Sequence, residues 1–228
     1  MTKFSKIIRE NNEKQLIHKF IGAFKVKLDK KSNKSKRFAF VLAGGESPIR
    51  LYKALSKDRK IEWKNVDFFI GDERYVKETS ENSNIKMCKK YLLNKIKISD
   101  NQIYKISTNK KSIKESALDY EKKIKRYFFN KKITFDLILL GIGNDGHIAS
   151  LFKNNINKKT NKNVNFIKKN DFLRITLTLK CLNNSKSIFL WAPGGEKLNI
   201  VKKILLDKKF KYPASFLKEK NNFLLYCN

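Results

Sequence analysis

The sequence contains little cysteine, proline, glycine or histidine, and each shortage excludes a class of protein. Its 228 residues include three Cys, three Pro, nine Gly and two His. So few Pro and Gly exclude a collagen-like or linker-rich chain. Cys88, Cys181 and Cys227 lie far apart and form no Cys-x-x-Cys pair, so we expect reduced thiols in a cytoplasmic protein. With two histidines and no cysteine cluster, we also expect no metal site.

Long apolar runs are absent as well. No run approaches the roughly 18 residues of a membrane-spanning helix, and the segment Met1–Arg9 lacks the apolar core of a signal peptide. We therefore expect no membrane partner. The length favours a single domain over residues 1–228, since one domain usually holds roughly 100–200 residues and α/β domains often run longer.

Acidic residues are the last group in short supply, with 21 Asp and Glu against 52 Lys and Arg and a net charge of +31. Such a balance raises the alternative of a nucleic-acid-binding protein. However, Lys is spread along the whole chain beside many Asn, and Arg, the preferred residue for bidentate phosphate and base contacts, is scarce. We interpret the charge as solvated surface that could steer an anionic substrate, and we expect no nucleic-acid partner.

Short apolar runs alternate with amphipathic segments along the chain, a pattern that predicts an α/β fold. Apolar runs predict strands over residues 38–43, 66–70, 135–140, 173–179, 188–192 and 223–226. Helical spacing predicts helices over 4–28, 48–55, 84–93, 113–129 and 196–206, with 147–152 also helical and 154–170 a loop. Ser47 and Pro48 are typical of an N-cap and a first helical position. The expected architecture is one Rossmann-like domain, a mostly parallel sheet with helices on both faces.

Four of the predicted strands end in small or charged residues. In a parallel sheet, ligands bind beyond the carboxyl ends of the strands, so we expect these four segments to converge on one site. They are Gly44-Gly45-Glu46-Ser47, Gly71-Asp72-Glu73-Arg74, Gly143-Asn144-Asp145-Gly146-His147 and Gly194-Gly195-Glu196-Lys197.

The segment Gly141–Gly146 matches the G-x-G-x-x-G pattern of dinucleotide-binding loops. Such a site also needs a following helix and an acidic residue roughly 20 positions later, and no acidic residue lies between Gly146 and Asp171. We therefore expect no bound dinucleotide.

The segment 44–48 joins a strand to a helix, where free N–H groups and the positive end of the helix dipole favour a phosphate. It lacks the Gly-Lys-Ser/Thr ending of a nucleotide-binding P-loop. The pattern alone leaves an ordinary tight turn equally open.

Two of the strand ends carry candidate acid–base residues. His147 follows a strand, where histidine could act as a general base because its charge changes near neutral pH. The alternative is a structural hydrogen bond at a helix start. Asp145 could orient His147 or serve as a turn residue. Asp72 and Glu73 could each act as an acid or a base, or could pair with Arg74.

Taken in order, these segments resemble the 6-phosphogluconolactonase family, which is related to the glucosamine-6-phosphate deaminases. The most specific piece is Asp-Gly-His-x-Ala-Ser-Leu-Phe at residues 145–152. After the histidine the deaminases typically continue Leu-Ala-Phe-Asn-Glu-Pro, and this chain lacks that glutamate. The resemblance covers nearly the whole chain, through segments 42–55, 71–84, 135–152, 174–179 and 194–197.

The resemblance implies a hydrolase that opens 6-phospho-D-glucono-1,5-lactone in the oxidative pentose phosphate pathway. It implies no metal and no organic cofactor, and the partner would be that small sugar-phosphate lactone. In keeping with the reduced thiols we expect a cytoplasmic location, and we expect a monomer or weak homodimer. His147 matches the base that activates water, and the candidate catalytic set is His147, Asp145 and Asp72. The residues implied in binding the substrate or its phosphate are Gly44, Gly45, Ser47, Arg74, Arg174 and Lys197.

Departures from the family pattern keep other functions open. Glu46 stands where the phosphate loop usually has a hydroxyl residue, which leaves a weakly active, drifted lactonase as one alternative. Asn144, Lys153 and Lys180 replace frequent prolines. A sugar-phosphate isomerase or deaminase, with Asp72 as the base, is a second alternative, and a basic nucleic-acid-binding module is a third.

Overall fold

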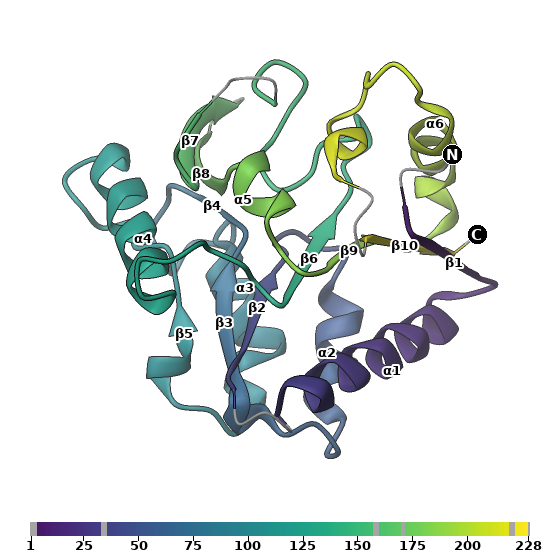
Figure 1. Ribbon diagram of the computed structural model, residues 1–228, viewed down its shortest axis with the longest axis horizontal. Helices are drawn as coiled ribbons and strands as arrows, with labels where there is room; N and C mark the ends of the chain where they lie inside the picture. Colours follow the sequence, from purple (N-terminus) through teal and green to yellow (C-terminus); the bar gives the residue numbers. More distant parts are fainter. Residues whose placement is uncertain (1–3, 33–35, 157–159, 170–171, 219–221, 228) are drawn as a thin grey trace.

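Uninterrupted apolar runs form the central sheet, because strands buried on both faces need no polar alternation. The computed structural model describes residues 4–32, 36–156, 160–169, 172–218 and 222–227. Its main sheet has the strand order β1-β10-β9-β6-β2-β3-β5, and the paired strands run parallel (Figure 1). These strands are β1 (Lys6–Glu10), β2 (Phe38–Leu42), β3 (Val66–Ile70), β5 (Ile103–Tyr104), β6 (Leu137–Gly141), β9 (Ile188–Ala192) and β10 (Asn222–Cys227).

A small antiparallel sheet stands beyond the carboxyl end of β3. Its strands lie in the order β4-β8-β7 (Figure 1). Only Gly71 separates β3 from β4, so the end of a central strand leads directly into this second sheet. The strands are β4 (Asp72–Arg74), β7 (Val164–Lys169) and β8 (Phe172–Leu177).

The helices cover the main sheet and the outer side of the small one. Helices α1, α2 and α3 contact one another in sequence, whereas α4 packs against β7 and β8. The helices are α1 (Glu13–Ser32), α2 (Ile49–Lys57), α3 (Asn84–Tyr91), α4 (Ile113–Tyr127), α5 (Leu179–Asn183) and α6 (Leu198–Leu206). Short 3-10 turns occupy residues 63–65, 93–95, 100–102, 195–197 and 213–216.

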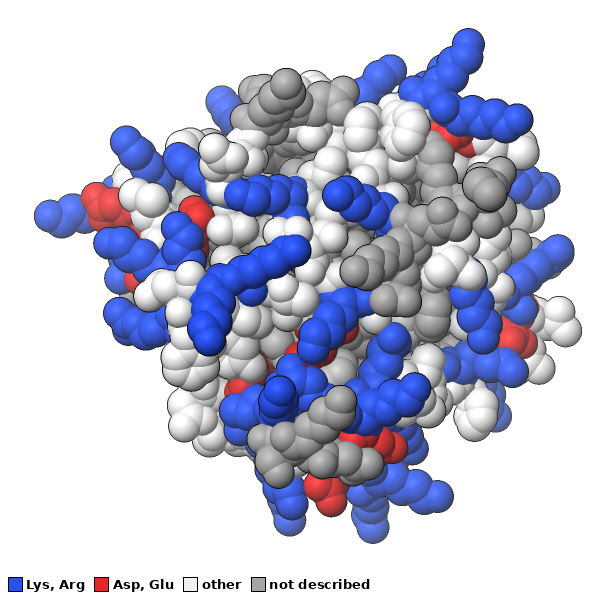
Figure 2. Space-filling view, in the orientation of Figure 1, with Lys and Arg blue, Asp and Glu red and all other residues white. Residues whose placement is uncertain are grey.

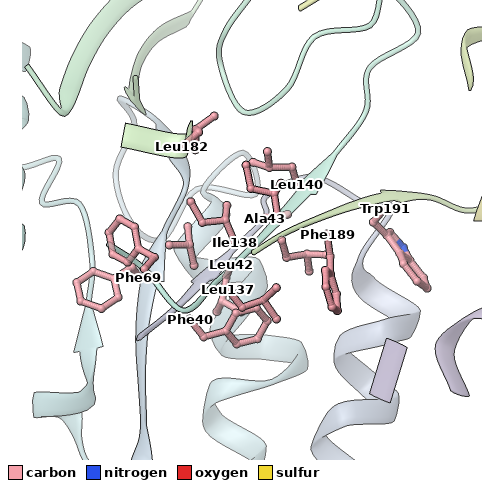
Figure 3. Close-up of a cluster of buried hydrophobic side chains, with 14 of the residues drawn as sticks. Phe40, Leu42, Ala43, Phe69, Leu137, Ile138, Leu140, Leu182, Phe189 and Trp191 are labelled. Atoms are coloured by element: carbon pink, nitrogen blue, oxygen red, sulfur yellow. The ribbon is translucent and has the colours of Figure 1, made fainter. Parts of the chain in front are cut away.

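Aliphatic and aromatic side chains fill the core on both faces of the main sheet (Figure 3). On the α1 side, the ring centroid of Phe20 lies 5.4 Å from that of Phe189 and 5.9 Å from that of Trp191. On the other side, the Phe69 ring lies 5.0 Å from the ring of Tyr127 on α4. Edge-to-face pairs of this kind stabilise a core beyond their buried area, so the layers hold the strand ends in fixed positions.

The predicted fold class is confirmed, since a Rossmann-like parallel sheet lies between helices. The predicted strands 66–70 and 188–192 have the observed bounds. The predicted helix over 4–28 is wrong at its start, because Lys6–Glu10 pairs with β10 as an edge strand and the helix begins at Glu13. The local sequence around Lys6–Glu10 cannot reveal its pairing with a strand at the other end of the chain.

The predicted loop over 154–170 is also wrong, because it contains β7, and the two-residue strand β5 was not predicted. Strand β7 is half polar and lies at the edge of the small sheet, where only Val164 among its residues is buried. Its pairing with β8 over six residues, rather than apolar content, makes it a strand.

Lys and Arg are scattered over the visible face of the protein, with few Asp and Glu among them (Figure 2). They gather in no single stripe on that face, which is consistent with a solvated surface. No helix within the described ranges is long and apolar enough to cross a bilayer.

Candidate active site

The strand ends of the two sheets surround one cavity of about 210 Å³. It contains residues from all four predicted segments, so the predicted convergence is observed. Except for Asp145, every candidate site residue lines it. The lining residues are Ala43, Gly44, Gly45, Ser47, Gly71, Asp72, Arg74, Asn84, Leu140, Gly141, Ile142, Gly143, His147, Ala149, Arg174 and Lys197.

The loop after β2 is anchored from both sides by buried aromatic residues. The hydroxyl of Tyr52 donates to the carbonyl oxygen of Ala43 at 2.7 Å, and the indole Nε1–H of Trp191 donates to that of Ser47 at 3.1 Å. The predicted helix start is corrected here: α2 begins at Ile49 with Pro48 as its N-cap residue, and no side chain caps it. Ser47 therefore lines the cavity instead of capping the helix.

Asn84 packs against the glycines of this loop, and sequence reasoning did not select it. A Cβ atom at Gly44 would lie 2.1 Å from the Asn84 side chain, so only glycine fits there. The N–H of Gly45, which has a φ of 77°, donates to Asn84 Oδ1 at 3.3 Å. Asn84 Nδ2–H donates to the carbonyl oxygen of Asp72 at 2.7 Å, which ties the loop to β4.

The carboxylate of Asp72 is held by Ser150, another residue that sequence reasoning missed. Ser150 is fully buried, and its hydroxyl donates to Asp72 Oδ2 at 2.6 Å. Its N–H donates to Thr176 Oγ1 at 3.2 Å. These bonds explain why the predicted helix over 147–152 is wrong: the segment turns, with Ala149 at a φ of 47°. The Ala-Ser pair in the motif at 145–152 was the available signal.

His147 is oriented by Asp145. Its Nδ1–H donates to Asp145 Oδ1 at 2.5 Å, and its own N–H donates to the same oxygen at 3.1 Å. Desolvation of the Asp145 carboxyl opposes these bonds, but they outweigh it and hold the pKa of Asp145 below its ordinary value. With the proton on Nδ1, the other ring nitrogen is left as an acceptor.

Two positions of the loop next to the His147 imidazole require glycine. A Cβ atom at Gly143 would lie 2.0 Å from His147 Nδ1. Gly146, with a φ of 79°, takes a left-handed conformation that other residues rarely adopt, and its carbonyl oxygen accepts from Ala214. Two glycines of the G-x-G-x-x-G match, Gly143 and Gly146, thus allow the loop to position the His147 ring.

Two arginines face each other across the small sheet. Arg74 on β4 and Arg174 on β8 are register partners, and opposed like charges destabilise a strand pair. Burial, and then the charge of Arg74, lower the pKa of Arg174 from its ordinary value. Among the described residues, the buried Nε atoms of both arginines have no hydrogen-bond partner. The arrangement suits an anion bound between the two guanidinium groups.

Lys197 and Glu46 complete the description of the predicted residues. Lys197 Nζ donates to Asn144 Oδ1 at 2.6 Å, so one departure from the family pattern contacts one predicted binding residue. Glu46 is exposed and lines an adjoining cavity of about 340 Å³ instead of the main one. Its carboxylate therefore lies outside the cavity that Ser47 lines.

Within the described part of the chain, no group of three or more His, Cys, Asp or Glu side chains is arranged to hold a metal ion. The cavity thus combines an oriented imidazole, a fixed carboxylate, a glycine-rich loop at a helix start and three cations. Such a set can bind an anionic ligand and transfer a proton at its other end.

Known proteins share both the sequence and the fold. The family model described as glucosamine-6-phosphate isomerases/6-phosphogluconolactonase matches residues 11–226. A 6-phosphogluconolactonase from Thermotoga maritima is 32% identical over 203 residues, 88% of each chain. A probable 6-phosphogluconolactonase from Schizosaccharomyces pombe is 32% identical over 225 residues, 90% of this chain and 86% of that one.

The crystal structure of the Thermotoga maritima 6-phosphogluconolactonase has a TM-score of 0.84 and 29% sequence identity to this chain. The match covers 97% of this chain and 99% of the other. Family model, sequence and fold agree along nearly the whole length. The chain belongs to the glucosamine-6-phosphate isomerase/6-phosphogluconolactonase family.

Proposed function

We propose that this protein hydrolyses 6-phospho-D-glucono-1,5-lactone to 6-phospho-D-gluconate. The observation that carries the proposal is the joint placement of an oriented His147 and the opposed pair Arg74 and Arg174 on one small cavity. The names of the relatives support the same reaction, since each of them is a 6-phosphogluconolactonase or a probable one.

The substrate phosphate would bind between the two arginines and the loop after β2. Their unpartnered Nε–H groups and the start of α2 supply donors and positive charge for a dianion. A phosphate held there is remote from the reacting carbonyl, so its binding energy serves to position that carbonyl. Gly44, Gly45 and Ser47 would contribute the backbone and hydroxyl donors.

His147 would act as the general base. The hydrogen bond from Nδ1 to Asp145 leaves Nε2 to accept a proton from water, whose oxygen then attacks the lactone carbonyl carbon. The tetrahedral intermediate collapses with cleavage of the ring C–O bond, and the proton returns to the leaving hydroxyl. Since a lactone is an activated ester, the reaction needs neither a metal nor an organic cofactor.

The developing oxyanion needs donors near the histidine. The N–H groups of the glycine-rich turn before His147 and the ammonium of Lys197 are the candidates, each worth roughly 3–4 kcal/mol in such a role. The Asp72 carboxylate, which Ser150 fixes at the cavity wall, would accept a hydrogen bond from a substrate hydroxyl.

Lactone hydrolysis by the purified protein tests the proposal. Freshly generated 6-phosphoglucono-1,5-lactone is used, spontaneous hydrolysis is subtracted, and His147→Ala is measured beside the wild type. A wild-type rate that falls by roughly 100-fold or more in the variant is expected for a general base. His18→Ala, which alters a histidine on α1 away from the cavity, is the matched control and should keep full activity.

Two other outcomes would revise the proposal. Wild-type hydrolysis that the His147 substitution leaves unchanged would remove the base from the mechanism and keep the reaction. Absence of hydrolysis above background, together with conversion of glucosamine 6-phosphate, would replace the lactonase by the other activity in the family name, with Asp72 as the base.

A further inference from the structure

Glu73 lies between two cavity residues in sequence, yet its side chain is directed away from the cavity. Asp72 and Arg74 on either side line the cavity, whereas Glu73 does not, and it is 1% exposed. The alternation of side chains along β4 produces this arrangement. A buried carboxyl group needs compensating hydrogen bonds, so its partners indicate what it holds in place.

Four donors converge on this carboxyl group. Oε1 accepts from the N–H of Asn84 at 2.7 Å and that of Arg74 at 2.9 Å. Oε2 accepts from the N–H of Ile85 at 2.8 Å and the hydroxyl of Ser83 at 3.2 Å. The group therefore binds the first residues of α3, where N–H groups lack partners within the helix and the helix dipole favours a negative charge.

The charge of Glu73 has no cationic partner in the part of the chain that the structure describes. Among the described residues it forms no ion pair with Lys, Arg or His, and the titratable groups that face it are Asp72 on its own strand and the buried thiol of Cys88 on α3. Desolvation outweighs the opposing N–H bonds and, with a smaller effect of Asp72, raises the pKa of Glu73 to about 7. Its ionisation thus changes near neutral pH.

The residue that Glu73 holds by its backbone is the one that joins the two walls of the cavity. Asn84 donates to the carbonyl oxygen of Asp72, accepts from Gly45 and fills the space above Gly44. Any shift at the start of α3 therefore moves the glycine loop relative to β4. Arg74 is fixed by the same carboxyl group through its own N–H.

We propose that ionised Glu73 is a positioning residue, which holds Asn84 and the loop of Gly44 and Gly45 in the geometry that binds the substrate phosphate. Protonation turns one of its acceptor oxygens into a donor, directed at groups that are themselves donors, and so loosens the start of α3. The substrate assignment rests on the proposed lactonase function, whereas the mechanical link does not.

The mechanical link is tested without any ligand. The backbone amide NMR shifts of Asn84 and Ile85 are followed between pH 5.5 and 8.5 in the wild type and in Glu73→Gln. We expect both amides to titrate with a midpoint near 7 in the wild type. Loss of that titration in the variant supports the link, and its persistence overturns it by assigning the titration to another group.

The functional consequence is tested with the stable product 6-phosphogluconate by calorimetry. At pH 8, Glu73→Gln should weaken binding by roughly tenfold, comparable to losing one charge-assisted contact. The ratio of the two dissociation constants should approach one at pH 6, since wild-type Glu73 is then largely protonated. Titration of the ligand phosphate affects both proteins and cancels in the ratio. A ratio that does not change with pH would overturn the proposal.

Glu121→Gln is the matched control. Glu121 is also a buried glutamate that accepts backbone and side-chain N–H groups, here from Asn163. Unlike Glu73 it forms an ion pair, with Lys125 at 3.3 Å, and it lies on α4 and does not line the cavity. It should lower stability and leave product affinity and KM unchanged, whereas Glu73→Gln should raise KM far more than it lowers kcat. Equal effects of the two substitutions would reduce Glu73 to a structural role. If the wild type neither binds product nor hydrolyses lactone, the lactonase proposal fails, and the amide titration still decides the role of Glu73.

Discussion

The two ends of the parallel sheet contain buried carboxylates in opposite electrostatic surroundings. At the amino end, Asp136 contacts Lys31 and Lys186 and accepts the N–H of Ala39, and Asp67 is paired with Arg37. At the carboxyl end, within the described residues, Asp72 and Glu73 form no ion pair.

Within the described part of the chain, Arg74 and Arg174 likewise form no ion pair, and they face each other. Charge at the amino end is compensated within the protein, which favours stability. At the site end the charged groups form no ion pair within the described residues, although the Asp72 carboxylate partly offsets the burial and the Arg74 charge that lower the pKa of Arg174. This arrangement leaves the groups available for a ligand. Because aspartate and arginine occur at both ends, the difference in charge pairing depends on the position of each residue along its strand and not on its type.

An Asp→Asn substitution can be made at either end of the sheet, and the largest effect on activity is expected at the site end. Asp72→Asn keeps the size of the side chain and an oxygen that can accept from Ser150, so the unfolding free energy should change by less than about 1 kcal/mol. Loss of the charge at the cavity should lower kcat/KM for the lactone by roughly 100-fold. Chemical denaturation and lactone hydrolysis measure the two quantities. A variant that unfolds much more easily and hydrolyses normally would remove Asp72 from the site.

At the amino end, the substitution is expected to lower stability and to leave activity nearly unchanged. Asp136→Asn leaves the ammonium groups of Lys31 and Lys186 without their shared partner, and removing one member of a buried pair is costly. Because Lys186 is about half exposed (56%), the loss of unfolding free energy should be moderate, about 2 kcal/mol. Hydrolysis per folded molecule should stay within about twofold. Urea denaturation followed by fluorescence gives the first value, and lost activity in the folded variant would break the comparison.

Substituting one of the opposed arginines should leave stability unchanged or increase it, whereas substituting a paired carboxylate should lower stability. Arg174→Met removes one of two like charges and retains a long apolar side chain against Phe152, which Arg174 covers at 5.9 Å. The melting temperature should stay constant or rise slightly, and the free energy of unfolding should increase by no more than about 1 kcal/mol. Calorimetric melting tests this, and a clear destabilisation would show that the pair is stabilised from within the protein.

A further comparison concerns the pH dependence of stability. The pKa of Glu73 is raised from its ordinary value near 4.5 to about 7, so the folded protein holds a proton that the unfolded chain releases between these values. The stability of the wild type relative to Glu73→Gln should therefore fall as pH rises from 4.5 to 7, and should then stay constant. Melting curves at several pH values measure the difference, and a difference independent of pH would contradict the raised pKa.

The sequence predicts the central part of this fold better than its edges. Buried strands such as β3 and β9 are apolar throughout, and the four strand ends could be assigned to one site from the rule for parallel sheets. Strands β1 and β7 could not be predicted in this way, because β1 depends on pairing with a strand at the other end of the chain and β7 on its edge pairing with β8 rather than on burial. Local spacing contains no information about such pairing.

The candidate site was predictable where a motif carries the chemistry, as at His147 with Asp145. Asn84 and Ser150 were not selected, since a polar residue that supports a loop has no pattern of its own. Glu73 was noticed only as a possible acid or base, and its buried position behind the cavity could come only from the strand alternation and its donors.

The central claim is that the unpaired cations at the site end serve the phosphate of the substrate. Its most direct test compares hydrolysis of 6-phosphoglucono-1,5-lactone with that of unphosphorylated glucono-1,5-lactone, in the wild type and in the double variant Arg74→Met with Arg174→Met. The account predicts that kcat/KM for the phosphorylated lactone falls by roughly 100-fold or more, while the low value for the unphosphorylated lactone is unchanged. An equal fall for both substrates would contradict the claim, because it would place the arginines in the chemistry or the folding and not in recognition of the phosphate.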